Sequence, residues 1–204
     1  IISSAADGAQ CVFAIDVDGD GDTDVLSASH DDDTIAWYEN DGSQNFSLRV
    51  ISTNADGPGD VFAVDVDGDG DIDVLSASWL DDKVAWYEND GSQNFTERII
   101  STTASGAEYV FAIDVDGDGD IGVLSASAYD DKVAWYENDG SQNFTERVIS
   151  TSADNVHEVF AADVDGDGDI DVLAAIHDDG TIVWYEQNSP PTLDAVGNIS
   201  IAED

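Results

Sequence analysis

The sequence predicts an all-β protein built from four copies of one four-stranded unit. An acidic string that begins Asp16-Val17-Asp18-Gly19-Asp20 recurs from Asp65, Asp114 and Asp163, at a constant spacing of 49 residues. A second marker, Trp37-Tyr38-Glu39, recurs at the same spacing from Trp86, Trp135 and Trp184. No stretch shows a sustained apolar period of about 3.6 residues, so the pattern does not favour helices.

Each unit reads as four short strands separated by loop and turn residues. In the first copy the expected strands cover residues 12–15, 25–29, 34–39 and 46–51, with the acidic loop after the first and turns at 31–33 and 40–42. The first is a short apolar run, as in a strand buried on both faces. The third is β-branched and aromatic, which favours a strand. The fourth carries Glu97-Arg98 and Glu146-Arg147 in later copies, which suits a solvated edge.

Four strands in a repeat of this length are typical of propeller blades. We therefore predict a β-propeller-like array of four four-stranded blades with a 49-residue repeat. The expected repeats cover about residues 1–48, 49–97, 98–146 and 147–188.

The two ends of the array carry complementary signals. Ile2-Ser3-Ser4 matches the end of a fourth strand, whereas the last copy stops after Trp184-Tyr185-Glu186 without one. Residues 1–5 would then either close the last blade of the same chain or pair with a neighbouring molecule and build a head-to-tail polymer. Residues 189–204 match no repeat. They are expected to be a linker, or a strand that leads to a further domain or is donated to a neighbour.

The pattern Asp-x-Asp-Gly-Asp-Gly-Asp-x-Asp predicts a calcium loop in every copy. Calcium takes six to eight oxygen ligands, and carboxylates at positions 1, 3, 5 and 9 with a backbone carbonyl at position 7 can wrap one ion. Glycines at positions 4 and 6 let the backbone reverse between ligands. The candidate ligands are Asp16, Asp18, Asp20, Asp22, Asp24, Asp65, Asp67, Asp69, Asp71, Asp73, Asp114, Asp116, Asp118, Asp120, Asp163, Asp165, Asp167, Asp169 and Asp171.

About one Ca²⁺ is expected per repeat, and the third site is expected to be the weakest because Gly122 replaces its last carboxylate. Many closely spaced carboxylates favour calcium over magnesium, and the lack of Cys and His in the loops disfavours zinc. Extracellular calcium modules typically bind at about 10⁻⁴–10⁻³ M. The loops therefore predict calcium-rich surroundings.

The composition excludes several classes of partner. Five basic residues face 46 acidic ones, and phosphate neutralisation needs Lys and Arg, so neither nucleic acid nor anionic lipid is expected. No run of about 18 apolar residues spans a membrane. Four divalent ions would reduce the formal charge of −41 only to about −33, so the remaining acidity suggests a saline habitat or an acidic coat. Cys11 is single, so no intrachain disulfide can form.

At these residues the sequence resembles the FG-GAP/VCBS repeat family, whose blades carry a D-x-D-x-D-G-type calcium loop between the first two strands. The resemblance covers about residues 10–188, and Phe13-Ala14 in place of Phe-Gly brings it closer to the VCBS branch. Residues 189–204 resemble the start of a cadherin-like or immunoglobulin-like module. The resemblance implies the fold and the metal; such repeats occur in integrin heads, secreted bacterial adhesins and some carbohydrate-active enzymes, so it implies no single ligand or activity.

Other residues give weaker signals. Trp37, Trp86, Trp135 and Trp184 recur at one strand position, which favours packing between blades over sugar stacking. Residues that vary between copies mark two candidate ligand faces: Trp79 with His30, Ala128 and His177, and the stretches 7–11, 56–60, 105–109 and 154–158. Asn45, Asn94, Asn143 and Asn198 begin glycosylation sequons. His30, His157 and His177 show no catalytic pattern, so no enzyme activity is expected.

These observations favour a secreted or cell-surface structural or adhesive module that binds calcium and self-associates through its terminal strands as a homo-oligomer or filament. The alternative is a glycan-binding propeller attached to a carbohydrate-active enzyme. In both cases the partner is a protein or glycan ligand at a surface. The sequence identifies neither that ligand nor whether the blades close within one chain.

Overall fold

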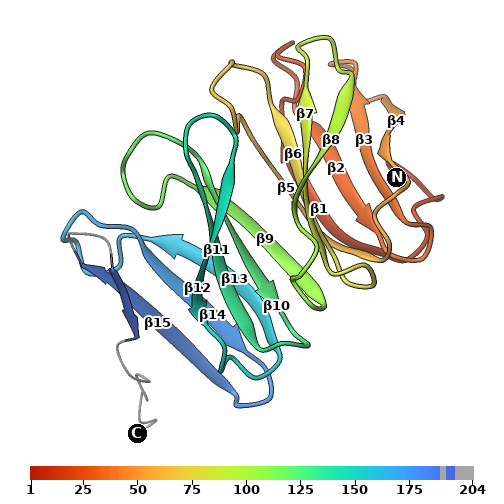
Figure 1. Cartoon of the computed structure of the whole chain (residues 1–204). Coiled ribbons are helices and arrows are strands. Elements are labelled where there is room, and N and C mark those ends of the chain that lie inside the picture. Colours follow the sequence, from red (N-terminus) through yellow and green to blue (C-terminus); the bar gives the residue numbers. More distant parts are fainter. Residues whose placement is uncertain (189–191, 196–204) are drawn as a thin grey trace, which may run out of the picture.

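A computed structural model describes residues 1–188 and 192–195 of the chain. Every regular element in these residues is a β-strand, and the strands form four antiparallel sheets of four strands each (Figure 1). Within each sheet the strands follow the order of the chain, so each sheet is a meander of hairpins. The prediction of an all-β chain with four repeated sheets is confirmed.

The strands recur with nearly identical lengths. They are β1 (Ala9–Ile15), β2 (Asp24–Ser29), β3 (Thr34–Asn40) and β4 (Phe46–Ser52); β5 (Pro58–Val64), β6 (Asp73–Ser78), β7 (Lys83–Asn89) and β8 (Phe95–Ser101); β9 (Ala107–Ile113), β10 (Gly122–Ser127), β11 (Lys132–Asn138) and β12 (Phe144–Ser150); and β13 (Val156–Ala162), β14 (Asp171–Ile176), β15 (Thr181–Asn188) and β16 (Thr192–Ala195). The first strand of each sheet begins three residues earlier than the apolar run alone predicts.

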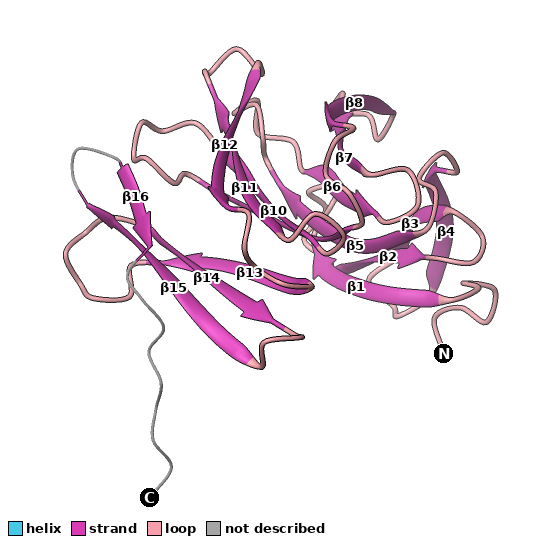
Figure 2. Ribbon diagram, turned by 60° about the horizontal axis from the view of Figure 1, so that its bottom comes forward, coloured by secondary structure: helices cyan, strands magenta, loops and turns pink. Residues whose placement is uncertain are grey.

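The first strands of the four sheets, β1, β5, β9 and β13, lie side by side (Figures 1 and 2). Their phenylalanine rings form a row in which neighbouring centroids are 4.9, 5.0 and 5.0 Å apart, through Phe13, Phe62, Phe111 and Phe160. The fourth strands β4, β8 and β12 are largely exposed. The sheets are therefore arranged like propeller blades, but the array is open and does not close into a ring (Figure 1).

The hydrophobic core lies between the sheets rather than within one of them. Three clusters of buried residues fill the three junctions between successive sheets. Trp37, Trp86 and Trp135 belong to these clusters and expose only 2, 3 and 7% of their surface. Their recurrence in the sequence therefore reflects packing between sheets, as predicted.

A repeated polar contact also joins each sheet to the next. Asp33, Asp82 and Asp131 each adopt a φ of 56° in the turn between the second and third strands. Their carboxylates accept the backbone N–H groups of Gly57, Gly106 and Asn155, in the next unit, at 3.0, 2.9 and 3.1 Å. Aspartate is among the few residues other than glycine that adopt this left-handed conformation readily. Gly180 occupies the corresponding position in the last sheet.

The end of the array differs from the sequence-based expectation. Residues 1–5 lie outside the strands, and the fourth position of the last sheet is filled by β16, which pairs with β15 through Asn188↔Thr192 and Tyr185↔Ala195. Residues 192–195 thus extend their own sheet rather than leading away from it. A strand that follows so soon after β15 closes a short loop, whereas closure by residues 1–5 would restrain almost the whole chain. Residues 189–191 and 196–204 lie outside the described part.

Candidate metal centre

Each acidic loop connects the first strand of a sheet to the second. The four loops therefore occupy equivalent positions, at the end of the sheet that also carries the turn between the third and fourth strands. The two segments are in contact: the side-chain N–H of Asn40 donates to the carbonyl of Thr23 at 3.0 Å. The turn between the second and third strands lies at the opposite end of each sheet.

The first aspartate of the loop organises the backbone around itself. In the first copy the two carboxylate oxygens of Asp16 accept the N–H groups of Gly19 and Gly21 at 2.8 and 2.9 Å. Both glycines have positive φ, 73° and 94°, which a side chain would strain. The same pair of bonds recurs on Asp65, Asp114 and Asp163. The glycines therefore serve the loop geometry that the sequence predicted.

The ninth residue of the loop is a fully buried carboxylate. Asp24 and its counterparts Asp73 and Asp171 have no exposed surface. One oxygen of Asp24 accepts the N–H of Val17 at 3.1 Å and the other accepts the N–H of Asn40 at 2.7 Å, so it clamps the loop to β3. Burial raises the pKa of Asp73 to about 6, against the lowering effect of hydrogen bonds from the backbone N–H groups of Asn89 and Val66.

The carboxylates converge in threes. In each copy three aspartates offer oxygen atoms that all lie within 4.8 Å of one another. The groups are Asp16, Asp18 and Asp24; Asp65, Asp67 and Asp73; Asp114, Asp116 and Asp118; and Asp163, Asp165 and Asp171. The other predicted ligands, Asp20, Asp22, Asp69, Asp71, Asp120, Asp167 and Asp169, lie outside these groups. The carboxylate of Asp22, for example, lies against Gly42 of the neighbouring turn.

The electrostatics of each group favour a hard cation. The pKa of Asp18 is raised, first by burial and then by the charges of Asp20, Asp24 and Glu39, against a hydrogen bond from the backbone of Asp20. The pKa of Asp67 is raised in the same way. The side-chain donors are all carboxylate oxygens, which suit calcium or magnesium and do not suit zinc or copper. The residues present therefore fit the ion that the sequence predicts.

The third loop lacks the buried clamp. Gly122 offers no carboxylate to Val115 or Asn138, and Asp118 takes the third place in the group. Burial and the charge of Asp118 raise the pKa of Asp116. The lower affinity expected of this copy stays a prediction, and its group of carboxylates differs from the other three.

Sequence reasoning missed the part played by the third strand. A residue at or next to its C-terminal end donates a backbone N–H to the buried aspartate in the first, second and fourth copies, through Asn40, Asn89 and Gln187. Glu39 and Glu88, one residue earlier, add negative charge near Asp18 and Asp67. The recurrence of Trp-Tyr-Glu at fixed spacing from each loop was the available signal.

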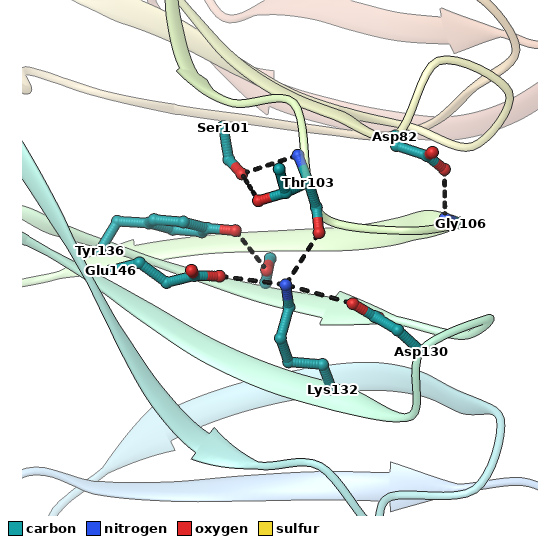
Figure 3. A network of polar contacts seen from close by, with 9 residues as sticks. Asp82, Ser101, Thr103, Gly106, Asp130, Lys132, Tyr136 and Glu146 are labelled. Carbon is teal, nitrogen blue, oxygen red and sulfur yellow. Dashed lines mark hydrogen bonds and ion pairs between the residues drawn. The ribbon is translucent and has the colours of Figure 1, made fainter.

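All five basic residues are occupied by carboxylates. Arg49, Arg98 and Arg147 pair with Glu39, Glu88 and Glu137 at 2.7 Å. Lys83 and Lys132 each pair with two carboxylates at 3.0–3.2 Å (Figure 3 shows Lys132). Within the described residues each arginine and lysine side chain is therefore neutralised by at least one carboxylate. In the described residues, no helix has the length and apolarity needed to cross a bilayer.

The variable residues gather at the end of the sheets opposite the acidic loops. Trp79 donates its indole N–H to the Tyr129 hydroxyl at 2.6 Å, and the two rings meet edge to face. The rings of His157 and His177 lie 4.9 Å apart. The polar contacts of the three histidine side chains run to acidic residues and to Asn155. This end is the second candidate site.

Three of the four sequons are exposed in equivalent turns. The side-chain N–H groups of Asn45, Asn94 and Asn143 donate to the carboxylates of Asp41, Asp90 and Asp139 at 2.8, 2.9 and 2.9 Å. These amides therefore have a structural role in the turn. Asn198 lies outside the described residues.

Comparison with known families gives a match to the repeat. The model of the FG-GAP-like repeat matches residues 16–76, 65–125 and 114–174, which together span most of the chain. Each match begins at the first aspartate of one loop and runs to the second strand of the next sheet. No curated protein sequence matches the chain significantly.

Several solved structures share the fold at low identity. A candidate 6-phosphogluconolactonase from Bacteroides fragilis superposes with a TM-score of 0.66 and 15% identity over 95% of this chain and 55% of its own. The periplasmic gluconolactonase of Pseudomonas aeruginosa gives 0.61 and 13%, over 91% and 53%. Rhamnogalacturonan lyase YesW gives 0.51 and 18%, over 84% and 41%. The chain spans about half the length of such structures, and the similarity shows a propeller-like fold alone.

Proposed function

This chain belongs to the FG-GAP-like repeat family, and we propose that it is a calcium-binding structural or adhesive module that acts outside the cell. The observation that carries the proposal is a cluster of three aspartate carboxylates that recurs in all four sheets. A bound divalent ion would supply the positive charge that such a group lacks. The aspartates of each loop would hold it and so fix the loop against the second and third strands.

Calcium suits these groups better than magnesium. Calcium accepts many carboxylates in an irregular shell, whereas magnesium demands near-ideal octahedral geometry and keeps several waters. In the first, second and fourth copies one of the three converging carboxylates is fully buried, so an ion there would be partly shielded from water. The expected affinity class, about 10⁻⁴–10⁻³ M, supports a location where calcium is abundant. The formal charge of −41 supports a saline medium that screens it.

Thermal unfolding with and without calcium tests the proposal. An ion present at about 100 times its Kd stabilises the folded state by about 2.7 kcal/mol for each site that it fills. The melting temperature should therefore fall sharply when EGTA replaces about 10 mM calcium, a concentration well above the expected Kd. Magnesium at the same concentration should restore little of it. The variant Asp65→Asn/Asp67→Asn, which weakens one loop, should show a smaller calcium-dependent shift than the parent.

An equal melting temperature in calcium and in EGTA, together with no metal by elemental analysis, would contradict calcium binding. Melting in magnesium chloride tests whether the stabilisation is specific to calcium. Melting in sodium chloride at matched ionic strength tests for charge screening, because screening depends on ionic strength rather than on the ion's coordination chemistry.

We further propose that the module assembles through its end faces with a second copy of itself. Val12 on β1 is 69% exposed, whereas its counterparts Val61, Val110 and Val159 are 1% exposed or less. At the other end Ile182 on β15 is 71% exposed, whereas Ile35, Val84 and Val133 are fully buried. Both end faces thus present the apolar residues that join sheets elsewhere. Two copies would also supply roughly the length of the solved structures that the chain resembles.

A glycan-binding module is the second candidate function. The exposed side chains of Tyr129 and Leu80, 65 and 57% exposed, lie beside Trp79 at the end opposite the acidic loops. Aromatic faces of this kind stack on sugar rings. Retention of the chain on an immobilised polysaccharide, with calcium present and self-association absent, would favour this function over the structural one.

A further inference from the structure

The third acidic group is incomplete in a definable way. In the other copies the ninth residue buries a carboxylate whose oxygens accept two backbone N–H groups. Gly122 removes that carboxylate, and the Trp135 side chain takes up part of the space. A Cβ atom at Gly122 would meet the indole nitrogen of Trp135, which has no hydrogen-bond partner in the described residues. The third loop therefore lacks one buried oxygen ligand.

A side chain from the next sheet reaches the same loop. Gln187, near the end of β15, donates from its amide Nε2 to the carbonyl of Val115 at 3.2 Å. Val115 lies between Asp114 and Asp116, so the amide lies against the loop itself. Gln187 and Asp116 also line one pocket of about 380 Å³.

The amide oxygen of Gln187 is buried and unused. The residue exposes only 4% of its surface, and its Oε1 has no hydrogen-bond partner in the described part of the chain. A buried amide oxygen without a partner costs free energy, so an ion or a water molecule beside it would stabilise the fold. Oxygen atoms of Gln side chains are ordinary calcium ligands.

The other copies do not present an equivalent side chain. Their residue at this position is asparagine, whose amide is consumed by its own turn. Asn138, for example, accepts the N–H of Gly140 and donates to the carbonyl of Ile121. In the last copy Gln187 is followed by Asn188 and Ser189, which replace the Asp-Gly that follows the asparagine in the other copies. Gln187 is also longer by one methylene, which lets it cross to the neighbouring sheet.

We propose that Gln187 completes the third cation site across the junction between the third and fourth sheets, with its Oε1 replacing the carboxylate that Gly122 lacks. This inference rests on the proposed calcium function of the loops. The site joins two sheets, so an ion there strengthens the docking of the last sheet. A neutral amide in place of a carboxylate also makes this site weaker than the other three.

Calorimetric titration of the calcium-free full chain with calcium chloride tests the assignment. The parent should bind four equivalents, one of them weaker than the rest. Asp116→Asn, which removes a carboxylate from the third loop, should lose the weak equivalent and so identify it. Gln187→Leu should weaken the same equivalent at least about tenfold and leave the other three unchanged, as expected for loss of one ligand. Gln44→Leu, which alters an exposed glutamine, is the matched control.

Gln187→Glu guards against a folding defect in the leucine variant. It should tighten the weak equivalent by about tenfold, since ligand charge tunes calcium affinity. The same variant should melt at a lower temperature than the parent in EGTA, because a new carboxylate then lies near Asp116, and at a higher one in calcium. A difference in melting temperature from the parent that changes sign between EGTA and calcium requires an ion beside residue 187.

The outcomes separate this inference from the calcium function. If Asp116→Asn removes the weak equivalent while Gln187→Leu and Gln187→Glu both leave it unchanged, Gln187 is not a ligand and the loops still bind calcium. If only three equivalents bind and Asp116→Asn has no effect on them, the third loop is not a site and the inference fails. If the parent binds no calcium, the proposed function fails.

Discussion

At the scale of single residues, the aspartate side chains of this chain accept hydrogen bonds from backbone N–H groups, in addition to any role in binding an ion. Asp16 accepts two glycine N–H groups inside its loop, and Asp33 accepts one from the next sheet. Asp41 accepts the N–H groups of Ser43 and Asn45 in its turn. Part of the acidic excess is therefore architectural, because short carboxylates replace missing backbone partners at turns.

Asp60 is a buried carboxylate whose charge opposes folding. It occupies the same position on β5 as Cys11, Tyr109 and Glu158 on the neighbouring first strands, and it accepts the N–H of Val110 at 3.0 Å. Burial raises the pKa of Asp60, against hydrogen bonds from Cys11, Val110 and Val61, and the charge of Glu158 adds to the rise. Its protonated form is therefore the one that the fold favours.

Asp60→Asn should increase stability at neutral pH. A raised folded-state pKa means that the stabilising contribution of Asp60 is present below its unfolded pKa and is lost as the pH rises through the folded one. The variant keeps a neutral group at every pH. Its advantage in urea unfolding should therefore be largest near neutral pH and should vanish at acid pH.

Asp41→Asn is the control of opposite sign. Hydrogen bonds, first that from the Asn45 side chain, lower the pKa of Asp41. Its contribution is present above the unfolded pKa and is lost as the pH falls through the folded one. This variant should therefore be less stable than the parent at neutral pH and equal to it in acid. Identical pH profiles for both variants would contradict the assignment.

At the scale of strands and loops, most positions followed from local pattern. Short apolar runs and β-branched or aromatic residues placed the strands, and the Asp/Gly spacing placed the loops, because both depend on near neighbours in sequence. Gln187 could not be assigned in this way, since its contact with Val115 joins residues of different sheets. The fourth strand of the last sheet was missed because residues 192–195 belong to no repeat. Pairing by proximity, rather than by pattern, put them beside β15.

Among the described residues, a buried ionic network around a lysine joins elements in the second and third sheets. Lys132 on β11 contacts Asp130 and Glu146 at 3.2 and 3.0 Å and donates to the carbonyl of Thr103 at 2.9 Å (Figure 3). Burial alone would lower the pKa of Lys132, but hydrogen bonds to Glu146 and Asp130 raise it. The lysine thus ties two strands of the third sheet to the segment that enters it.

Lys132→Thr should destabilise the chain by about 2 kcal/mol, because it leaves partly buried carboxylates unpaired. The first sheet has Thr34 and Leu48 at the positions of Lys132 and Glu146. The double variant Lys132→Thr/Glu146→Leu reproduces that arrangement and should recover part of the loss. Urea unfolding of the single and double variants measures both effects.

The exposed pair Arg147–Glu137 supplies the control for this network. Arg147→Met should cost no more than about 1 kcal/mol, since exposed ion pairs contribute little. A double variant no more stable than Lys132→Thr would contradict the idea that an unpaired Glu146 causes the loss.

At the scale of the whole molecule, stability is carried by junctions between sheets. Three clusters of buried residues serve four sheets, so each end sheet has one packed face and one open face. The sequence predicted blades that close within one chain or associate between chains. The structure shows an open array, in which the two end faces are free to associate with another copy. A junction between the fourth sheet and the first sheet of a second copy would lack the polar contact made elsewhere by Asp33 and its counterparts, because Gly180 replaces the aspartate.

Assembly should therefore depend on the two exposed apolar positions at the ends of the array. Burying one isoleucine side chain contributes about 1.5–3 kcal/mol, so Ile182→Asp should weaken association by more than about tenfold. Val12→Asp should do the same from the opposite face, whereas Leu80→Asp, on an exposed turn, should not. Sedimentation in calcium should show the parent as a dimer or larger and both end variants as monomers.

Gly180→Asp provides the gain-of-function arm of this experiment. Gly180 already has a φ of 60°, close to the 56° of Asp33, so the aspartate can adopt the same turn. Its carboxylate would then meet the N–H of Gly8 in a second copy, as Asp33 meets Gly57. The variant should associate more tightly than the parent. If the parent and Gly180→Asp both sediment as monomers at high concentration in calcium, a second copy does not cover these faces and the assembly proposal fails.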